Sequence, residues 1–320
     1  MHKDLIFAID LGGTSTKMAI LQLDGTVKHQ WQIPTDKREN GKHIVANIAR
    51  SFNDKLIELK MDKSQFAGAG IGAPGPAHEG KILNAVNLGW GVYPLQDKLN
   101  EVLGIPAFIS NDANCAALGE MWMGSGRGFS NLVFITLGTG VGGGIIINGQ
   151  IVEGVRGGAG EIGHIPVTHN GGFRCNCGKD GCLETVASAT GIRRLALERL
   201  ADESQETALR EIMEQKGDIT AKDVFDLVDR DPVAREIVDE VCSHLGFAIA
   251  MLTATLNPEA VILGGGVAKA GERLLLPVRH HYQRYAFPTT RDDTKILLAT
   301  LGNDAGIFGA GWLVKRGMNL

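Results

Sequence analysis

The chain has 320 residues, of which 44% are hydrophobic and 21% charged, so it can bury one large or two moderate cores without disulfides. Its formal net charge of -4 and the lack of any block of like charge exclude a basic surface for nucleic acid. Asp10 interrupts the apolar stretch 5–9 too early for a signal peptide or a membrane span, so we expect a cytoplasmic protein with no nucleic acid and no membrane among its partners.

Two segments of the chain are typical of β-hairpins. In residues 1–25 the strands LIFAID and MAILQL enclose a GGTSTK turn, and a second turn follows at 24–25. In residues 132–150 the pattern returns as LVFITL, GTGVGGG and IIIN, with a turn at 148–149. Two such units about half a chain apart predict a duplicated fold with a phosphate-binding hairpin in each half.

The first glycine loop combines backbone donors with charged side chains. Gly12 and Gly13 let the backbone approach a ligand closely and point N–H groups at phosphate oxygens. Asp10 ends the preceding apolar strand, where it is placed to hold Mg²⁺ through water. Thr14 and Lys17 follow, and a plain hairpin turn requires neither them nor the carboxylate. We therefore interpret the loop as a phosphate site.

Strands and helices alternate between the two hairpins. Residues 40–59 have helical spacing, residues 67–76 (AGAGIGAPGP) predict a buried strand with a proline loop, and residues 108–124 (FISNDANCAALGEMWMG) pass from a strand into a helix. This alternation predicts an α/β fold.

Asp112 lies where that strand gives way to the helix, and the positive end of the helix favours an ionised carboxylate there. Taken alone, Asp112 is more simply explained as a helix cap. Beside two phosphate loops it becomes the candidate general base.

The second glycine loop contains Gly138, Thr139 and Gly140 within a G-x-G-x-x-G string, which by itself is a weak dinucleotide signal. A strand, IIINGQI, follows it, whereas the dinucleotide fingerprint requires a helix there. A second phosphate hairpin is therefore the better interpretation.

The strongest chemical signal is a cluster of metal ligands. Cys175, Cys177 and Cys182 lie within eight residues among glycine turns, and His164 precedes them by eleven residues. In a cytosolic chain such clustering indicates a metal and not disulfides. Four protein ligands predict a tetrahedral Zn²⁺ site without an open position, so this ion is expected to organise structure.

Two carboxylates flank the metal ligands. Glu161 comes three residues before His164, and Glu184 comes two residues after Cys182. A folded metal loop would hold both toward a common point, where sugar hydroxyls require acceptors. Taken alone, two glutamates are more often solvated surface charges.

Beyond residue 184 the chain is mainly helical. Helices are predicted at 190–200, at 206–215, from a capped start at Thr220 and Asp223, from Asp231-Pro232 to about Leu256, and from about Asp304 onward. The fourth of these turns wholly apolar from Leu245, so its second half is expected to be buried.

A further strand, AVIL, ends in Gly264, Gly265 and Gly266, where an adenine or a ribose could lie against bare backbone. Taken alone, this segment is equally well explained as a loop.

Together these motifs resemble the ROK family of bacterial repressors, open-reading-frame proteins and kinases. The matching strings are D-x-G-G-T-x-x-K at 10–17, G-A-P-G-P at 72–76, N-D-A at 111–113, L-G-T-G-V-G-G-G at 137–144, E-x-G-H at 161–164 and C-x-C-G-x-x-G-C-x-E at 175–184. The last string is the most specific, and the resemblance covers essentially the whole chain.

The resemblance implies an actin-like, ribonuclease-H-like ATPase fold of two α/β lobes with the active site in the cleft between them. The duplication predicts a boundary near residue 113, between a small lobe of residues 1–112 and a large lobe of residues 113–303 with the zinc loop and the helical segment. The resemblance implies that the C-terminal helix 304–320 returns to the small lobe. Lobe closure on sugar binding and a homodimer or homotetramer are also implied.

The resemblance also assigns roles by position. Asp112 would accept the proton of the attacking sugar hydroxyl. The implied sugar site comprises Gly72, Asn87, Asn111, Asp112, Glu161, His164 and Glu184. The last three would face C1 and C2 of the sugar, so His164 would place one ring nitrogen on zinc and the other toward the sugar.

The implied function is phosphorylation of the 6-hydroxyl of a hexose by ATP and Mg²⁺. Glucose is favoured, because CNCGKDGCLETVASATGI and NAVNLGWGVYPL resemble Gram-positive-type glucokinases of the family. Fructose, N-acetylmannosamine and N-acetylglucosamine are the alternatives. The family's repressors form another class, but they carry an N-terminal helix-turn-helix, whereas the phosphate loop begins here at Asp10, so repression is disfavoured.

Overall fold

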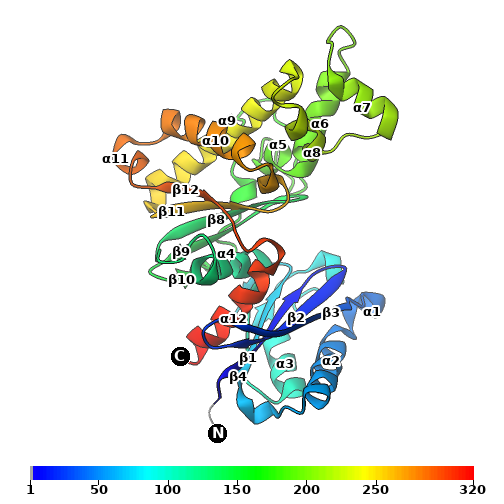
Figure 1. Cartoon of the computed structure of the whole chain (residues 1–320), viewed down its shortest axis with the longest axis vertical. Coiled ribbons are helices and arrows are strands. Elements are labelled where there is room, and N and C mark those ends of the chain that lie inside the picture. Colours follow the sequence, from blue (N-terminus) through cyan, green and yellow to red (C-terminus); the bar gives the residue numbers. More distant parts are fainter. Residues whose placement is uncertain (1–2) are drawn as a thin grey trace. The chain divides into compact units, whose positions relative to one another are not determined.

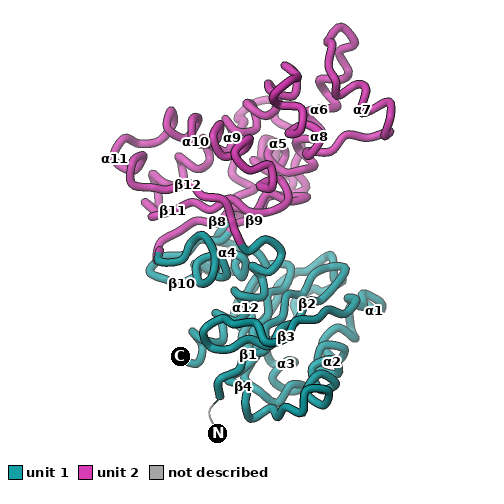
Figure 2. Tube along the Cα trace, in the orientation of Figure 1, with its two compact units in different colours: residues 1–128, 144–160, 301–320 teal, residues 129–143, 161–300 magenta. Residues whose placement is uncertain are grey.

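The computed structural model describes residues 3–320, and the contacts within it divide the chain into two compact units (Figures 1 and 2). Unit 1 comprises residues up to 128, residues 144–160 and residues 301–320. Unit 2 comprises residues 129–143 and 161–300. The boundary expected near residue 113 concerns lobes that close on sugar binding, and it stays a prediction.

Unit 1 is built on a five-stranded sheet of order β3-β2-β1-β4-β7. Its strands are β1 (Leu5–Leu11), β2 (Ser15–Gln22), β3 (Val27–Pro34), β4 (Phe66–Ala73) and β7 (Ala107–Asn111); β5 (Ala77–His78) and β6 (Lys81–Ile82) form a separate small pair. β1 and β2 pair antiparallel, which confirms the first hairpin, whereas β1, β4 and β7 run parallel.

Helices cover both faces of this sheet. They are α1 (Arg38–Gly41), α2 (Ile44–Leu59), α3 (Leu95–Leu103), α4 (Asp112–Met123) and α12 (Ala305–Gly317). Side chains of β1 alternate between two cores, because successive residues of a strand point to opposite faces. Phe7 packs in one core with Phe52 of α2, and Ile6 packs in the other with Ala310 and Val314 of α12.

The helix expected over residues 40–59 begins four residues late, at Ile44. Glu39 and Asn40 have φ of 51° and 55°, a left-handed conformation that an α-helix of L-residues cannot continue through.

Unit 2 contains most of a second five-stranded sheet, of order β10-β9-β8-β11-β12. The strands are β8 (Leu132–Leu137), β9 (Val141–Ile147), β10 (Gln150–Ile151), β11 (Ala260–Gly264) and β12 (Lys295–Leu298). β9 begins in unit 2 and ends in unit 1. β8 and β9 are neighbours joined by the glycine loop 138–140, which confirms the second hairpin.

The helices of unit 2 are α5 (Glu184–Ala187), α6 (Ala189–Leu200), α7 (Ala208–Lys216), α8 (Ala221–Leu227), α9 (Pro232–Leu256), α10 (Glu272–Tyr285) and α11 (Pro288–Arg291). Of these, α6 to α9 match predicted helices, whereas α10 and α11 were not predicted. Thr220 caps α8 in a reciprocal box with Asp223, and Asp231 caps α9 by accepting from the Ala234 N–H. α7 begins two residues later than expected, after its cap Thr207.

Within residues 3–320, α9 is the one helix long and apolar enough to cross a membrane. It is a core helix of unit 2, because it packs against α8 and α10 and buries Leu245 and Ile249 completely. The burial expected for its whole second half is incomplete, since Ala254 and Thr255 are exposed.

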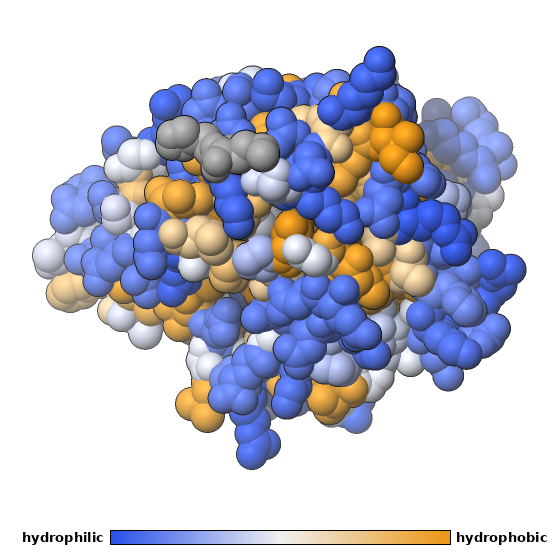
Figure 3. Space-filling model, turned by 90° about the horizontal axis from the view of Figure 1, so that it is seen from below, coloured by the Kyte–Doolittle hydropathy of each residue, from blue (hydrophilic) through white to orange (hydrophobic). Residues whose placement is uncertain are grey.

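Hydrophilic residues dominate the face seen in Figure 3, where they surround smaller hydrophobic areas. The large hydrophobic side chains exposed on the described chain include Ile57, Val86, Val92, Val155 and Phe287. Single exposed apolar side chains are normal on folded proteins, so they indicate no docking surface by themselves.

Candidate active site

In unit 1 the parallel strands end level with one another. Asp10 of β1 pairs with Gly72 of β4, and Gly72 pairs with Ser110 of β7. A Cβ at position 72 would lie 3.0 Å from Cys115 Sγ and 3.6 Å from Asp112 Cα, so this position favours glycine. Asp10, Gly72 and Asp112 therefore meet at the carboxyl edge of the sheet, where ligands of open α/β sheets bind.

Asn111, and not Asp112, is the N-cap of α4. Its Oδ1 accepts from the N–H groups of Ala113 (2.9 Å) and Asn114 (3.2 Å), and its Nδ2 donates to Gly75 O (3.1 Å). Asp112 occupies the first helical position, is exposed, and accepts from the Ala113 N–H at 2.8 Å. Asn111 therefore supplies the N-cap, and Asp112 accepts one N–H group of the first turn.

A threonine that the sequence did not reveal braces the first glycine loop. The Thr35 hydroxyl donates to Gly12 O at 2.7 Å, and the Thr35 N–H donates to Thr14 O at 2.9 Å. The turn itself is closed by a bond from Gly12 N to Ser15 O at 3.0 Å. Thr35 follows β3 and reaches the loop because β3 pairs with β2. No local sequence pattern indicates that contact.

The other predicted residues of this loop have distinct surroundings. Asn87, in a short 3₁₀ helix (Val86–Leu88), lies beside the loop, since a Cβ at Gly13 would be 3.9 Å from Asn87 Cβ. Lys17 Nζ donates to Asn303 O at 2.7 Å. The phosphate contact expected of Lys17 stays a prediction.

A second acidic residue that sequence reasoning missed is Asp304. The string Asn303-Asp304-Ala305 repeats the N-D-A of residues 111–113, and each copy begins a helix. Those helices, α4 and α12, pack against each other in unit 1. The repeat of the tripeptide Asn-Asp-Ala was the sequence signal that could have identified Asp304.

Burial raises the pKa of the Asp10 carboxyl from 3.8 to about 6. The positive charge of Lys17 lowers this pKa, whereas the negative charges of Asp112 and Asp304 raise it. A Cβ at Gly306 would lie 2.8 Å from Asp10 Cγ, so the chain also packs tightly against this carboxyl. A divalent cation would relieve the desolvated charge, which fits Asp10 to the expected Mg²⁺ site.

We expect Asp10→Asn to stabilise the protein in Mg²⁺-free buffer at about pH 8, by up to about 3 kcal/mol. A raised folded-state pKa contributes stability below the unfolded value that is lost as pH rises through the folded value, here between 3.8 and about 6. Denaturant unfolding of both proteins at about pH 5 and about pH 8 measures the effect, which should be larger at the higher pH. Equal stability of both proteins at both pH values would contradict it.

In unit 2 the second glycine loop is tied to the helices behind it. Gly138 N donates to Gly140 O at 2.9 Å, and Gly138 O accepts from Ala189 N at 2.8 Å. Glu184 Oε2 accepts from the Val141 N–H at 3.0 Å and would lie only 2.2 Å from a Cβ at Gly140. The sequence placed Glu184 at the metal loop, and the structure shows that it also packs on the glycine loop.

The third glycine segment adjoins this loop. Gly264 pairs with Thr136 of β8, and Gly265, with φ of 86°, leaves no room for a Cβ because Leu137 O would lie 2.5 Å away. A cavity of about 360 Å³ opens within unit 2 beside the segment. Its lining includes Ala189, Lys222, Phe225, Gly266 and Lys269. A partly apolar cavity of this size next to bare backbone suits a planar base.

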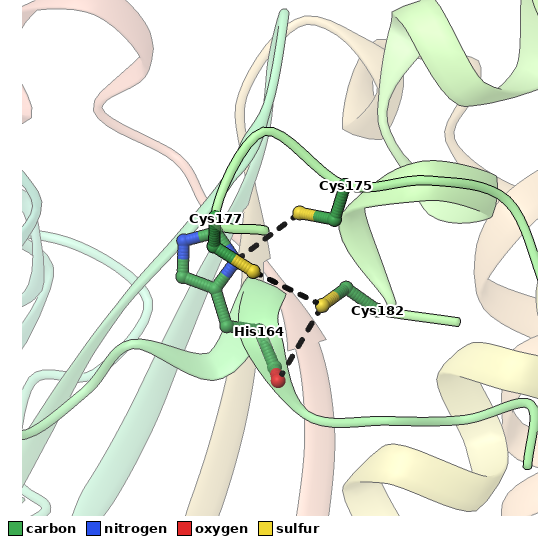
Figure 4. A group of neighbouring side chains, drawn as sticks. All are labelled: His164, Cys175, Cys177 and Cys182. Atoms are coloured by element: carbon green, nitrogen blue, oxygen red, sulfur yellow. Dashed lines mark hydrogen bonds between the residues drawn. The ribbon is translucent and has the colours of Figure 1, made fainter. Parts of the chain in front are cut away.

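The four predicted metal ligands converge in unit 2 (Figure 4). Cys175 Sγ lies 3.6 Å from His164 Nδ1, Cys177 Sγ lies 3.6 Å from Cys182 Sγ, and all four ligand atoms lie within 4.8 Å of one another. Ligands at a Zn–S distance of about 2.3 Å form a tetrahedron with edges of about 3.8 Å. The cluster is therefore consistent with a structural zinc site.

Both flanking glutamates reach this cluster. Glu161 Oε2 lies 3.8 Å from His164 Nε2, and Glu184 Oε1 lies 3.9 Å from Cys175 Sγ. His164 thus turns Nδ1 toward the cysteines and Nε2 toward Glu161. Both glutamates therefore lie beside the metal cluster, and their convergence on one sugar stays a prediction.

The chain contains two five-stranded sheets with helices, a glycine hairpin in each half and a Cys₃His cluster. These features define the mixed α/β fold of a two-lobed sugar kinase. The chain belongs to the ROK family, whose family model matches residues 6–317.

The relatives cover nearly the whole chain. It is 51% identical to a glucokinase of Halalkalibacterium halodurans, over 97% of this chain and 95% of that protein. It is 36% identical to a glucokinase of Thermotoga maritima, over 99% of both. The crystal structure of a ROK family glucokinase from Streptomyces griseus, in complex with glucose and AMPPNP, superposes with a TM-score of 0.78 at 33% identity, over 98% of this chain and 100% of that one.

Proposed function

We propose that this protein is an ATP-dependent glucokinase that transfers a phosphoryl group to the 6-hydroxyl of glucose. The observation that carries the kinase assignment is the place of Asp112 at the carboxyl edge of the unit 1 sheet, beside Asp10 and Gly72. The near full-length identity to glucokinases supports glucose as the sugar.

Asp112 acts as the general base. Its exposed carboxylate accepts the proton of the attacking hydroxyl, which contributes a rate factor of about 10² to 10⁴. Asn87 and Asn111 hold neighbouring hydroxyls and so fix the attacking oxygen. Asn111 keeps one Nδ2 hydrogen for this purpose, because the other is donated to Gly75 O.

The two glycine loops bind the phosphates of ATP. The N–H groups of Gly12 and Gly138 close the two turns, and those of Gly13, Thr139 and Gly140, with the hydroxyls of Thr14 and Thr139, orient the transferred group and compensate its charge. Asp10 would hold Mg²⁺ through water, and the bound ion would neutralise charge on the phosphate oxygens.

The base of ATP occupies the unit 2 cavity beside Gly264–Gly266. Phe225 and Ala189 offer apolar surface there, and Ala189 also binds the second phosphate loop through its N–H. The first residue of α6 thus contacts both the cavity for the base and the second phosphate loop.

The metal loop positions the remaining sugar ligands. Zn²⁺ held by His164, Cys175, Cys177 and Cys182 fixes the loop, and Glu161, His164 and Glu184 then accept or donate to hydroxyls near C1 and C2. We also propose a cytosolic location and assembly into a homodimer or homotetramer. The lobe of residues 1–112 and 304–320 closes on the lobe of residues 113–303 when sugar binds.

A coupled assay of ADP release with MgATP tests the function. We expect kcat/KM for glucose to exceed that for mannose, fructose, N-acetylmannosamine and N-acetylglucosamine at least about tenfold, which is about 1.4 kcal/mol of transition-state discrimination. A lead for an N-acetyl sugar would overturn the substrate and keep the kinase. Failure to phosphorylate any sugar would overturn both.

A further inference from the structure

A short segment of unit 2 joins the metal cluster to the second phosphate loop. It begins at the metal ligand Cys182 and ends at Thr190, in the first turn of α6. The loop, residues 138–141, lies in the same unit. The segment contacts the backbone of this loop through Glu184, Ala189 and Thr190.

The start of α6 holds two carbonyl groups of the loop. Ala189 N donates to Gly138 O at 2.8 Å, and the Thr190 hydroxyl donates to Thr139 O at 2.9 Å. In a planar trans peptide the N–H of the next residue points the opposite way from the carbonyl. Fixing both carbonyls therefore aims the N–H groups of Thr139 and Gly140 away from α6, and these are the donors assigned to phosphate above.

Glu184 connects the same loop to the metal cluster. Its Oε2 accepts from Val141 N at 3.0 Å and would lie 2.2 Å from a Cβ at Gly140. Its Oε1 lies 3.9 Å from Cys175 Sγ. One carboxylate thus contacts both the loop and a metal ligand, so its contact to the loop depends on how firmly the cysteines are held.

Packing and hydrogen bonds fix the segment between the metal ligand and α6. Cys182 O accepts from the Thr185 hydroxyl at 2.7 Å and from the Thr185 N–H at 2.9 Å. Ala187 has 0% exposure, and Ser188, at 1%, caps α6 with its side chain. A shift of Cys182 is therefore passed on to Thr190, because closely packed buried side chains cannot move independently.

We propose that Thr190 is a positioning residue for ATP, and that zinc at the Cys₃His cluster supports nucleotide binding through residues 182–190. The proposal rests on the proposed function, because it takes the loop 138–140 to hold phosphates. Without the Thr190 hydroxyl the peptide plane between Thr139 and Gly140 is free to rotate, and ordering it again weakens binding. Thr190 is not among the residues of the proposed sugar site, so glucose affinity is unaffected.

Thr190→Val tests the role of the hydroxyl in the full chain. Valine keeps the shape of threonine but cannot donate. We expect MgADP to bind about threefold to tenfold more weakly in calorimetric titration, and KM for MgATP to rise by the same factor, with KM for glucose within about twofold. Thr190→Ser keeps the hydroxyl and should restore nucleotide affinity. Thr255→Val is the control, because Thr255 is also exposed and donates to a backbone carbonyl, Met251 O at 2.8 Å in α9.

Zinc depletion by Cys177→Ser tests the part of the metal. Cys177 is exposed, so the substitution disturbs no core packing. We expect MgADP to bind about tenfold more weakly. In the protein without nucleotide or sugar, hydrogen exchange should quicken in peptides covering 138–142 and 183–191, and stay at the parent rate in peptides covering 274–283 of α10. Cys242→Ala, which leaves the metal cluster intact, should keep the parent MgADP affinity.

Equal MgADP affinity of Thr190→Val and Thr255→Val would overturn the role of Thr190, and so would failure of Thr190→Ser to restore binding. Parent-like MgADP affinity and exchange in zinc-depleted Cys177→Ser would overturn the part of the metal, as would a rise in exchange spread over both units, which indicates general destabilisation. A parent protein that does not bind MgADP would refute the proposed function. Exchange at 138–142 in Thr190→Val and Cys177→Ser, which needs no nucleotide, would then decide whether the segment holds the loop.

Discussion

We expect Asp112→Asn to lower kcat for glucose phosphorylation by about 10² to 10⁴-fold while glucose still binds. Asparagine matches the shape of aspartate but cannot take the proton of the 6-hydroxyl at neutral pH. The first turn of α4 should persist, because its cap is Asn111. Steady-state kinetics with MgATP and calorimetric titration with glucose, in the absence of nucleotide, measure the two effects separately.

Asp97→Asn is the matched control for this prediction. Asp97 also lies exposed in the first turn of a unit 1 helix, α3, and is not among the residues of the proposed site. It should keep the parent kcat and glucose affinity. Turnover by Asp112→Asn equal to that of the control would refute the assignment of the base, and loss of glucose binding along with turnover would shift Asp112 to a purely substrate-holding role.

The second large effect is expected from Cys177→Ser, which should reduce bound zinc well below one ion per chain and weaken glucose binding about 10² to 10³-fold. Cys177 is exposed, so the substitution leaves no cavity and acts through the metal. The estimate assumes that Glu161, His164 and Glu184 each lose a hydrogen bond of about 1 to 1.5 kcal/mol once the loop is free. Metal analysis and glucose titration of the purified variant measure both quantities.

Cys242→Ala is the control for cysteine loss as such. Cys242 is buried between α9 and α10, where it donates to Leu274 O, and it lies outside the metal cluster. Its variant should lose stability but keep zinc and glucose affinity. Parent-like glucose binding by zinc-depleted Cys177→Ser would show that the metal does not position the sugar ligands.

Acid should also release the metal. Burial raises the pKa of the Cys182 thiol to about 12 in the metal-free protein, so zinc must displace its proton at neutral pH. Zinc affinity consequently falls as pH falls, and zinc titrations of the parent protein at several pH values measure the effect. A zinc affinity that does not change with pH would contradict the prediction.

Much of the local structure followed from short-range patterns. The turns of both hairpins, the box of Thr220 with Asp223 and the cap at Asp231 were predicted because they depend on residues within a few positions of one another. The cysteine spacing predicted the metal cluster for the same reason. A helix start was misplaced at Asn40, where two residues adopt left-handed φ without any glycine to signal it.

What the sequence by itself determined was therefore both glycine hairpins, the helices α4, α6 to α9 and α12, and the four residues of the metal cluster, whereas β3, α3, α10 and β12 were not predicted. Only the tertiary structure decided how those residues act. It set Glu184 on Val141 and braced Gly12 with Thr35. Each of these is a contact between segments far apart in sequence, and no periodicity or local propensity carries information about which distant donor will meet which acceptor.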